Sequence, residues 1–147
     1  NNPWTFVLPY NQTKDGFSKE FLGSEALLSV TDPEYTYPFV GYDLRKIVNY
    51  DAAEVLDSKG NVIGSLLSCV TDMAIGRHEG WIYSIASPDK PEDFRPRGLC
   101  CGFVKVKSPL AVDQVIQIKE NKRSIKVQIA DNIRPARTAR AKMKDMI

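Results

Sequence analysis

Side chains suited to nucleophilic or acid–base chemistry are few in this sequence. It holds three cysteines, Cys69, Cys100 and Cys101, and a single histidine, His78. A catalytic thiol needs a neighbouring base, and His78 is the only histidine available for that role. The cysteines, however, lie in apolar segments without metal-ligand spacing, and a lone histidine in a Gly-flanked loop is usually solvated or structural. We therefore predict core cysteines, a histidine without direct function, no catalytic residue in this chain and no metal site.

The cysteine pattern and the lack of long apolar runs indicate in which cellular compartment we expect the protein. Cys100 and Cys101 are adjacent, so in a strand their side chains face opposite ways and they cannot easily share a disulfide. An odd number of buried thiols is typical of a reduced, cytosolic protein. The sequence has no apolar run of about 18 residues and no signal peptide at its start. We expect a cytoplasmic protein without a membrane partner and, because the sequence does not begin with Met, a processed chain or a piece of a longer one.

Basic residues are concentrated at the end of the sequence. The net charge is only +2, but residues 131–147 carry five basic against two acidic side chains. Such a tail is able to neutralise an anionic partner, with strongly salt-dependent binding as the signature. The tail has no interleaved aromatic residues and no nucleic-acid motif, so a nucleic-acid partner is not expected. A solvated charge run, or a tail docked on another part of the protein, is the simpler interpretation.

The length and composition predict one folded domain, organised around residues 55–75. A chain of 147 residues with 43% hydrophobic and 26% charged residues is typical of a globular domain. Within 55–75, a polar Gly-bearing turn at 57–61 precedes a β-branched and aliphatic run that predicts a strand. Gly64 predicts a bulge or a close backbone approach in that strand. The stretch 97–107 has the same character and is predicted to be its neighbour in a sheet.

Further elements are predicted on either side of these two strands. They are a helix at 24–30 that Pro33 stops, a strand over 35–45 with a bulge at Gly41, and a hairpin of alternating strands at 115–119 and 124–129. Residues 76–97 form a long connection with a short strand or helical turn at 81–85, and a helix is predicted from Pro135 onward. The pattern predicts a mainly β fold: a small antiparallel six-stranded barrel or jelly-roll-like domain with a short N-terminal helix.

The order of these segments resembles the C-terminal part of the glycine cleavage T-protein (aminomethyltransferase) family. Phe21–Leu27 is similar to that family's Phe-Ile-Gly-X-Glu-Ala-Leu segment, which leads from the folate-binding core to the C-terminal barrel. Four more segments match in order: Asn2-Pro3 with Leu8-Pro9-Tyr10, then Val40-Gly41-Tyr42, Gly60–Gly64 and Leu99–Val104. The resemblance spans residues 2 to about 130.

This resemblance implies a piece of a larger enzyme. Residues 1–33 would be the end of the folate-binding core with its connecting helix, and residues 34–147 the C-terminal β-barrel domain with its basic tail. The implied cofactor is tetrahydrofolate, bound in the parent protein and weakly or not at all by this chain, because the family's catalytic aspartate and folate cavity lie further upstream. The implied partner is the missing N-terminal folate-binding domain of the same protein.

Three residues are candidates for the folate side of such a barrel. Tyr10 matches the family's aromatic residue beside the cavity, and Asp72 and Arg77 follow the long central strand. For Tyr10 the simpler interpretation is a core aromatic, and for Asp72 and Arg77 it is a solvated rim.

Three functions remain open, and the third, a purely structural domain, differs from the first only by what lies upstream of this chain. In the first, the chain is the barrel of a tetrahydrofolate-dependent aminomethyltransferase, or of a related O- or S-demethylase, which moves a one-carbon unit by positioning and electrostatics while the barrel closes one side of the folate site. On this interpretation the chain alone is inactive. In the second, it is a stand-alone β-barrel binding module that uses the basic tail for an anionic partner.

Overall fold

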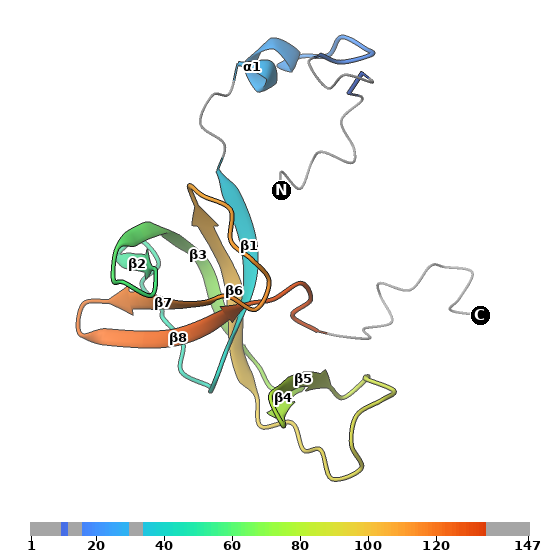
Figure 1. The fold of residues 1–147 in the computed structure, drawn as a ribbon, viewed down its shortest axis with the longest axis vertical. Helices are drawn as coiled ribbons and strands as arrows, with labels where there is room; N and C mark the ends of the chain where they lie inside the picture. Colours follow the sequence, from blue (N-terminus) through green and yellow to red (C-terminus); the bar gives the residue numbers. More distant parts are fainter. Residues whose placement is uncertain (1–9, 12–15, 30–33, 135–147) are drawn as a thin grey trace.

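Six strands close into an antiparallel barrel in the computed structural model, which describes residues 10–11, 16–29 and 34–134 (Figure 1). Around the barrel the order is β1-β6-β3-β2-β7-β8, and β8 pairs with β1 to close the ring. The strands are β1 Tyr35–Gly41, β2 Ala53–Leu56, β3 Val62–Asp72, β6 Leu99–Val106, β7 Val115–Glu120 and β8 Arg123–Ile129. The predicted fold class, a mainly β six-stranded antiparallel barrel with one short helix ahead of it, is confirmed.

The central hairpin forms where the sequence predicts it. Between β2 and β3, the Asp57 carboxylate accepts hydrogen bonds from the backbone N–H of Lys59 and of Asn61, each at 2.8 Å, and Gly60 takes a positive φ of 86°. These contacts are those of a tight turn with a side-chain cap. The predicted pairing of β3 with β6 is also confirmed, and it extends from Gly64 opposite Val106 to Asp72 opposite Leu99.

Glycines let neighbouring strands approach closely. A Cβ on Gly64 would overlap the carbonyl oxygen of Lys105, and one on Gly102 would overlap that of Ser68. The pairing of β2 with β3 also shifts register next to Gly64, between Val55 and Leu56, so the predicted close approach and the predicted bulge occur together.

Two predicted boundaries differ in the structure, and a third prediction is not tested by it. The strand predicted over 35–45 ends at Gly41, which is not a bulge: a Cβ there would overlap the Cys100 sulfur, so glycine is required by that side chain. The helix predicted at 24–30 is α1, Ser24–Leu28, with Gly23 at its N-cap in a left-handed conformation. The helix predicted from Pro135 lies outside the described residues.

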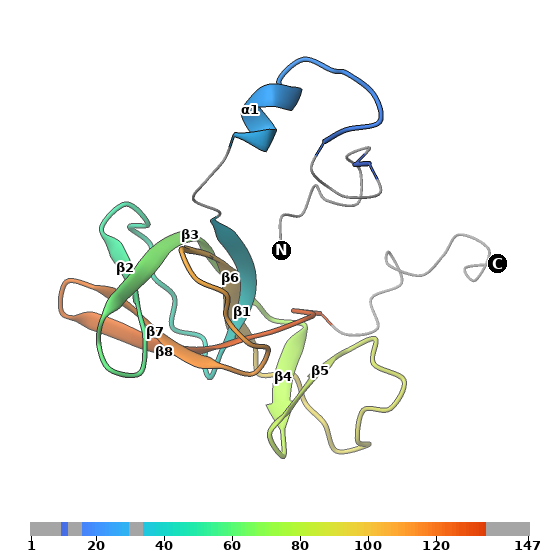
Figure 2. The same cartoon turned by 45° about the horizontal axis from the view of Figure 1, so that its top comes forward.

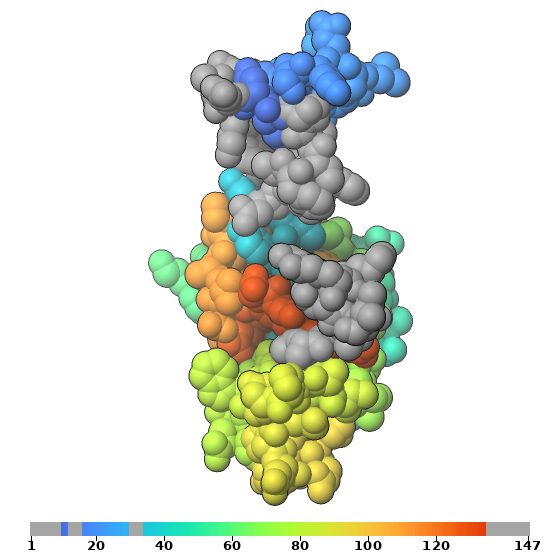
Figure 3. Space-filling view, turned by 90° about the vertical axis from the view of Figure 1, so that its right-hand side faces the viewer, coloured from blue at the N-terminus to red at the C-terminus, as the bar shows by residue number. Residues whose placement is uncertain are grey.

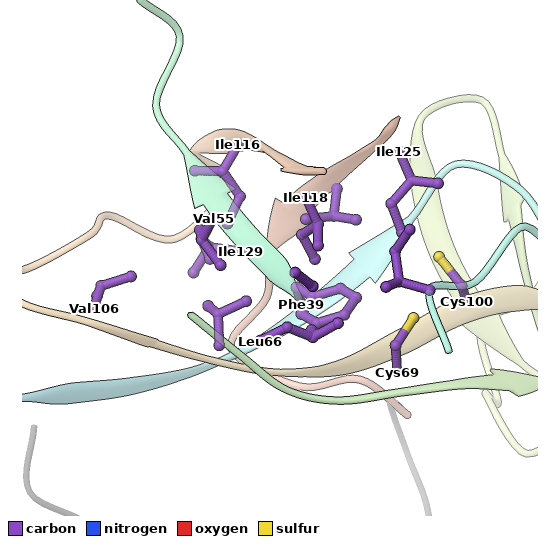
Figure 4. Packing of buried hydrophobic residues seen from close by; sticks show 14 residues of the cluster. Phe39, Val55, Leu66, Cys69, Cys100, Val106, Ile116, Ile118, Ile125 and Ile129 are labelled. Atoms are coloured by element: carbon purple, nitrogen blue, oxygen red, sulfur yellow. The ribbon is translucent and has the colours of Figure 1, made fainter. Parts of the chain in front are cut away.

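The barrel interior is filled by apolar side chains. They come from all six strands and from Ile47, and they include the thiols of Cys69 and Cys100 (Figure 4). Phe39 is fully buried near the centre, and Ile116, Ile118 and Ile129 are also among the largest fully buried residues. A barrel of this size is packed with side chains and leaves no room for a ligand inside.

A second, smaller cluster lies outside the barrel wall. It joins Val40, Leu99 and Cys101 of the wall to Ile75 and Ala130, with Ile82 and Ile133 packed against it. The strands β4, Ile75–His78, and β5, Trp81–Ser84, form a hairpin over this cluster. We call residues 73–98 the hairpin lobe; it projects from one end of the barrel (Figure 3). The predicted long connection therefore contains a hairpin, and the short strand predicted at 81–85 is β5.

The N-terminal segment packs on itself through its aromatic rings. The ring centroids of Tyr10 and Phe17, and those of Phe17 and Phe21, are 4.8 Å apart. Helix α1 buries none of its residues. Figures 1 and 2 draw this segment beyond one end of the barrel, with the hairpin lobe at the other end.

Candidate functional site

Asp72 is held in an ion pair at the end of β3. The Arg134 guanidinium donates to both carboxylate oxygens, at 2.8 Å from Nε and 2.6 Å from Nη2, and the Ala74 backbone N–H donates at 2.9 Å. The Asp72 side chain is only 16% exposed. The hydrogen bond to Asp72 raises the pKa of Arg134, which favours the protonated guanidinium. The pair fastens the segment after β8 to the barrel wall, which gives Asp72 a structural role.

Arg77 joins the hairpin lobe to two barrel strands. Its Nη2 donates to the Gln128 side-chain oxygen of β8 at 2.7 Å, and its Nε donates to the Gly41 carbonyl at the end of β1 at 3.4 Å. Nη1 donates to the Gly80 carbonyl within the lobe at 3.3 Å. The guanidinium also lies over the Tyr42 ring, 4.4 Å from its centroid, in a cation–π contact.

The partners of Arg77 accept three hydrogen bonds from it without neutralising its charge. They are carbonyl and amide oxygens and a tyrosine ring, and no described carboxylate lies within ion-pair distance. Asp113 is one step removed, because the Gln128 side-chain nitrogen donates to it at 2.8 Å. Burial lowers the pKa of Arg77, and electrostatic interactions with Tyr42 and Asp113 oppose that shift. Arg77 is thus a half-buried cation without a direct counter-ion.

Arg77 forms part of the wall of a hollow of about 580 Å³. We call it the arginine hollow; its lining residues are Tyr42, Asp43, Leu44, Arg45, Arg77, Arg97, Gly98 and Leu99. The segment after β1 separates it from a second hollow of about 580 Å³, over β7 and β8, lined in part by Tyr42, Val115 and Lys126. Chemically, the arginine hollow offers guanidinium groups beside a tyrosine and a leucine.

The structure brings two of the three predicted site residues to one end of the barrel. Asp72 ends β3 and Arg77 lies in the hairpin lobe that follows it, whereas Tyr10 packs on Phe17 in the N-terminal segment at the other end (Figure 1). The folate contact assigned to these three residues stays a prediction. The polar atoms of Asp72 and Arg77 already bind protein groups.

The cysteines are buried, as predicted. Cys100 and Cys101 face opposite sides of β6: Cys100 lies in the barrel interior with Cys69, and Cys101 lies in the outer cluster. A hydrogen bond between the two interior thiols lowers the pKa of Cys69 to about 7 and raises that of Cys100. Burial raises the pKa of Cys101 to about 11.

The His78 side chain lies beside a carboxylate. It lies in β4 opposite Trp81, with Nε2 3.8 Å from the Asp93 carboxylate, while the cysteines lie in the two clusters. Among the residues that the structure describes, no group of three His, Cys, Asp or Glu side chains is arranged to hold a metal ion. Within the same residues, no helix has the length and apolar character needed to cross a membrane.

Sequence reasoning missed Arg97, Gln128 and Arg134 as parts of this end of the barrel. Arg134 was grouped with the basic tail, and its partner is 62 positions away in the sequence. Gln128 is 51 positions from Arg77, and Arg97 reaches the hollow only because β6 begins beside the segment after β1. The only local signal in the sequence is the glycine that follows Arg97. In the structure Gly98 has a φ of 77° and forms a sharp turn into β6.

No protein-family model matches the chain, and a search of curated proteins found no match.

Proposed function

We propose that this chain is the C-terminal barrel of a tetrahydrofolate-dependent aminomethyltransferase or a related demethylase, and that it closes one side of the folate site. The observation that supports the proposal is the closed six-stranded barrel preceded by a short helix, in which the segments that resemble the family lie in or next to regular elements. Phe21–Leu27 enters α1, Gly60–Gly64 forms the turn into β3, and Leu99–Val104 lies in β6, the neighbour of β3.

The surface of the N-terminal segment supports a partner domain. Leu22 is fully exposed, at 103% of its reference area, and Leu27 and Leu28 are 40% and 45% exposed. Apolar side chains gathered on one short segment mark a packing surface. On our proposal this surface packs on the upstream folate-binding domain, and Tyr10 faces the folate from the same segment.

The composition of the barrel interior supports a scaffold role. Its cluster consists of aliphatic side chains, one phenylalanine and two thiols, so it offers no acid–base pair for one-carbon transfer. The transfer itself would take place in the upstream domain, which binds tetrahydrofolate, while the barrel shields the site from water and fixes its geometry.

The alternative, a binding module that uses its basic tail, stays a prediction. Residues 135–147 lie outside the described part of the chain, and Arg134 at its border binds Asp72. Trimming the tail and measuring salt-dependent binding to an anionic polymer would test it.

The test of the main proposal uses the complete reading frame beside the 147-residue chain. We expect the complete protein to bind tetrahydrofolate by calorimetry, Tyr10→Ala to weaken that binding about fivefold or more, and Tyr10→Phe to retain it. The isolated chain should show binding weaker than about 1 mM. Tight tetrahydrofolate binding by the isolated chain, or a complete protein that does not bind it, would refute the proposal.

The predicted docking surface has a separate test. Leu22→Asp should leave the unfolding temperature of the isolated chain unchanged and lower that of the complete protein by several degrees, about 2–4 °C per kcal/mol of lost packing. Lys19→Asp introduces the same side chain at a nearby exposed position and serves as the control. Equal effects of the two substitutions in the complete protein would argue against docking through Leu22.

A further inference from the structure

The arginine hollow has an excess of positive charge. Arg45 is neutralised by Asp43, with 2.7 Å between its Nη2 and the carboxylate. Arg77 and Arg97 also line the hollow, and no described carboxylate lies within ion-pair distance of either. Two guanidinium charges therefore face one space without a counter-ion.

Arg77 is the more costly of these two charges, because it is half-buried. Water solvates it incompletely, and its hydrogen bonds go to Gly41, Gly80 and Gln128, none of which carries charge. A buried cation that lacks an opposite charge is unfavourable, and an anion placed nearby relieves that penalty. Its contacts also hold the guanidinium in place, so little side-chain entropy would be lost on binding.

Apolar side chains line the same hollow. Tyr42 and Leu44 are 47% and 46% exposed although both are large hydrophobic residues. Glycine at position 98 lets Leu44 lie close to the start of β6. A Cβ on Gly98 would lie 2.6 Å from the Leu44 side chain and 2.7 Å from the Met73 sulfur. The hollow thus presents a small apolar surface next to its arginines.

We propose that the arginine hollow binds a small organic anion, a carboxylate attached to an aromatic or aliphatic body. The carboxylate lies between Arg97 and Arg77, where a guanidinium is a geometrically matched donor. The body packs on Leu44 and Tyr42. The volume of about 580 Å³ is within the range of ligand-binding pockets. The site consists only of residues of this chain, so the inference does not depend on tetrahydrofolate binding by a longer protein.

The experiment is a titration of the ¹⁵N-labelled chain followed by amide NMR shifts, with phenylacetate as the probe. Phenylacetamide tests the charge, because it keeps the ring and loses the carboxylate, and inorganic phosphate tests the organic body. We expect saturable shifts at Leu44, Arg97 and Gly98 with phenylacetate, and binding of phenylacetamide and of phosphate that is each weaker by about fivefold or more.

Matched variants locate the binding. Arg97→Gln removes an arginine of the hollow, and Arg95→Gln removes the same charge from an exposed arginine that donates to Glu92 and Phe94 carbonyls outside it. Arg97→Gln should weaken phenylacetate binding about fivefold, and Arg95→Gln should leave it unchanged. Spectra of both variants without ligand establish that the barrel is folded.

Several outcomes would overturn the inference. They are the absence of saturable shifts, equal binding of phenylacetate and phenylacetamide, phosphate binding as tight as that of phenylacetate, and equal effects of the two variants. Tetrahydrofolate binding by the complete protein is a separate readout, and we expect it to be the same in Arg97→Gln and the unaltered protein. Failure of one proposal therefore leaves the other intact.

Discussion

The barrel and the hairpin lobe reach their structures by different means. In the barrel, each strand pairs with two neighbours and the interior is filled by one continuous apolar cluster. The lobe contains one two-stranded antiparallel sheet of four residue pairs, and individual side chains make its polar contacts. Ser84 and Ser87 are buried hydroxyl residues there, and the Ser87 oxygen accepts the Ser84 backbone N–H at 3.0 Å. The barrel should therefore unfold as a unit, whereas the lobe should open locally.

The largest expected effect comes from truncating one phenylalanine in each region. Phe39→Ala leaves a cavity at the barrel centre and should lower the free energy of unfolding by about 3–5 kcal/mol. Phe94 is 5% exposed and packs on Tyr83 with 5.7 Å between ring centroids. Phe94→Ala should lower global stability by no more than about 2 kcal/mol, because the lobe opens on its own.

Urea denaturation and amide hydrogen exchange measure these two effects. For Phe94→Ala, we expect lost protection in residues 75–98 and retained protection in the barrel strands. An equal loss of global stability in both variants would show that the lobe and the barrel form one cooperative unit.

The next effect concerns two glycines, one in close contact with a neighbouring strand and one in an open turn with a positive φ. Gly102→Ala pushes a methyl group into the Ser68 carbonyl and should cost about 3 kcal/mol, because β3 and β6 must separate. Gly60→Ala is the control: φ is +86° and no atom lies within 4 Å, so only backbone strain of about 1 kcal/mol is expected. Thermal unfolding of the two variants and of the unaltered chain measures these losses of stability. Similar losses would mean that the close approach of the strands is readily relaxed.

A smaller effect is expected from the ion pair between Asp72 and Arg134. Asp72→Asn removes a charge-assisted pair that is largely shielded from water and should cost about 1–2 kcal/mol. In a double-mutant cycle with Arg134→Gln, the second substitution should add little to the first. Arg45→Gln breaks the exposed pair with Asp43, where the side chains are 69% and 44% exposed, and should change stability less than Asp72→Asn does. Strictly additive losses for Asp72 and Arg134 would exclude a direct energetic contact.

The smallest effect is a pH dependence at the turn before β3. Hydrogen bonds from Asn61 lower the pKa of Asp57 below its ordinary value of 3.8. The ionised carboxylate is thus favoured in the folded state, and its contribution is present above the unfolded-state pKa and lost as pH falls through the lower folded-state pKa. The stability difference between the unaltered chain and Asp57→Ala should therefore shrink below about pH 4. A carboxyl titration by NMR with a midpoint above 3.8 would contradict this assignment.

The same contrast between regions decides how much the sequence could predict. In the barrel, alternation over β7 and β8, the Asp57 turn and the pairing of β3 with β6 were all readable, because side-chain period and turn chemistry act over a few residues. The lobe and the arginine hollow were not, because their geometry depends on contacts between distant positions such as Arg77 with Gln128. Asp72 ends the long strand β3, whereas Arg77 lies in β4 of the lobe, and the partners of both residues carry no local signal in the sequence.

The seam between β1 and β8 has a consequence for synthesis of the protein. Only three residue pairs join these strands, and they bring together Phe39–Gly41 and Val127–Ile129, which are far apart in the sequence. A ribosome-bound chain is therefore expected to hold an open sheet with two exposed edges until β8 leaves the exit tunnel. Unpaired strand edges favour edge-to-edge association with other chains, so the nascent barrel should be most prone to aggregation during that interval.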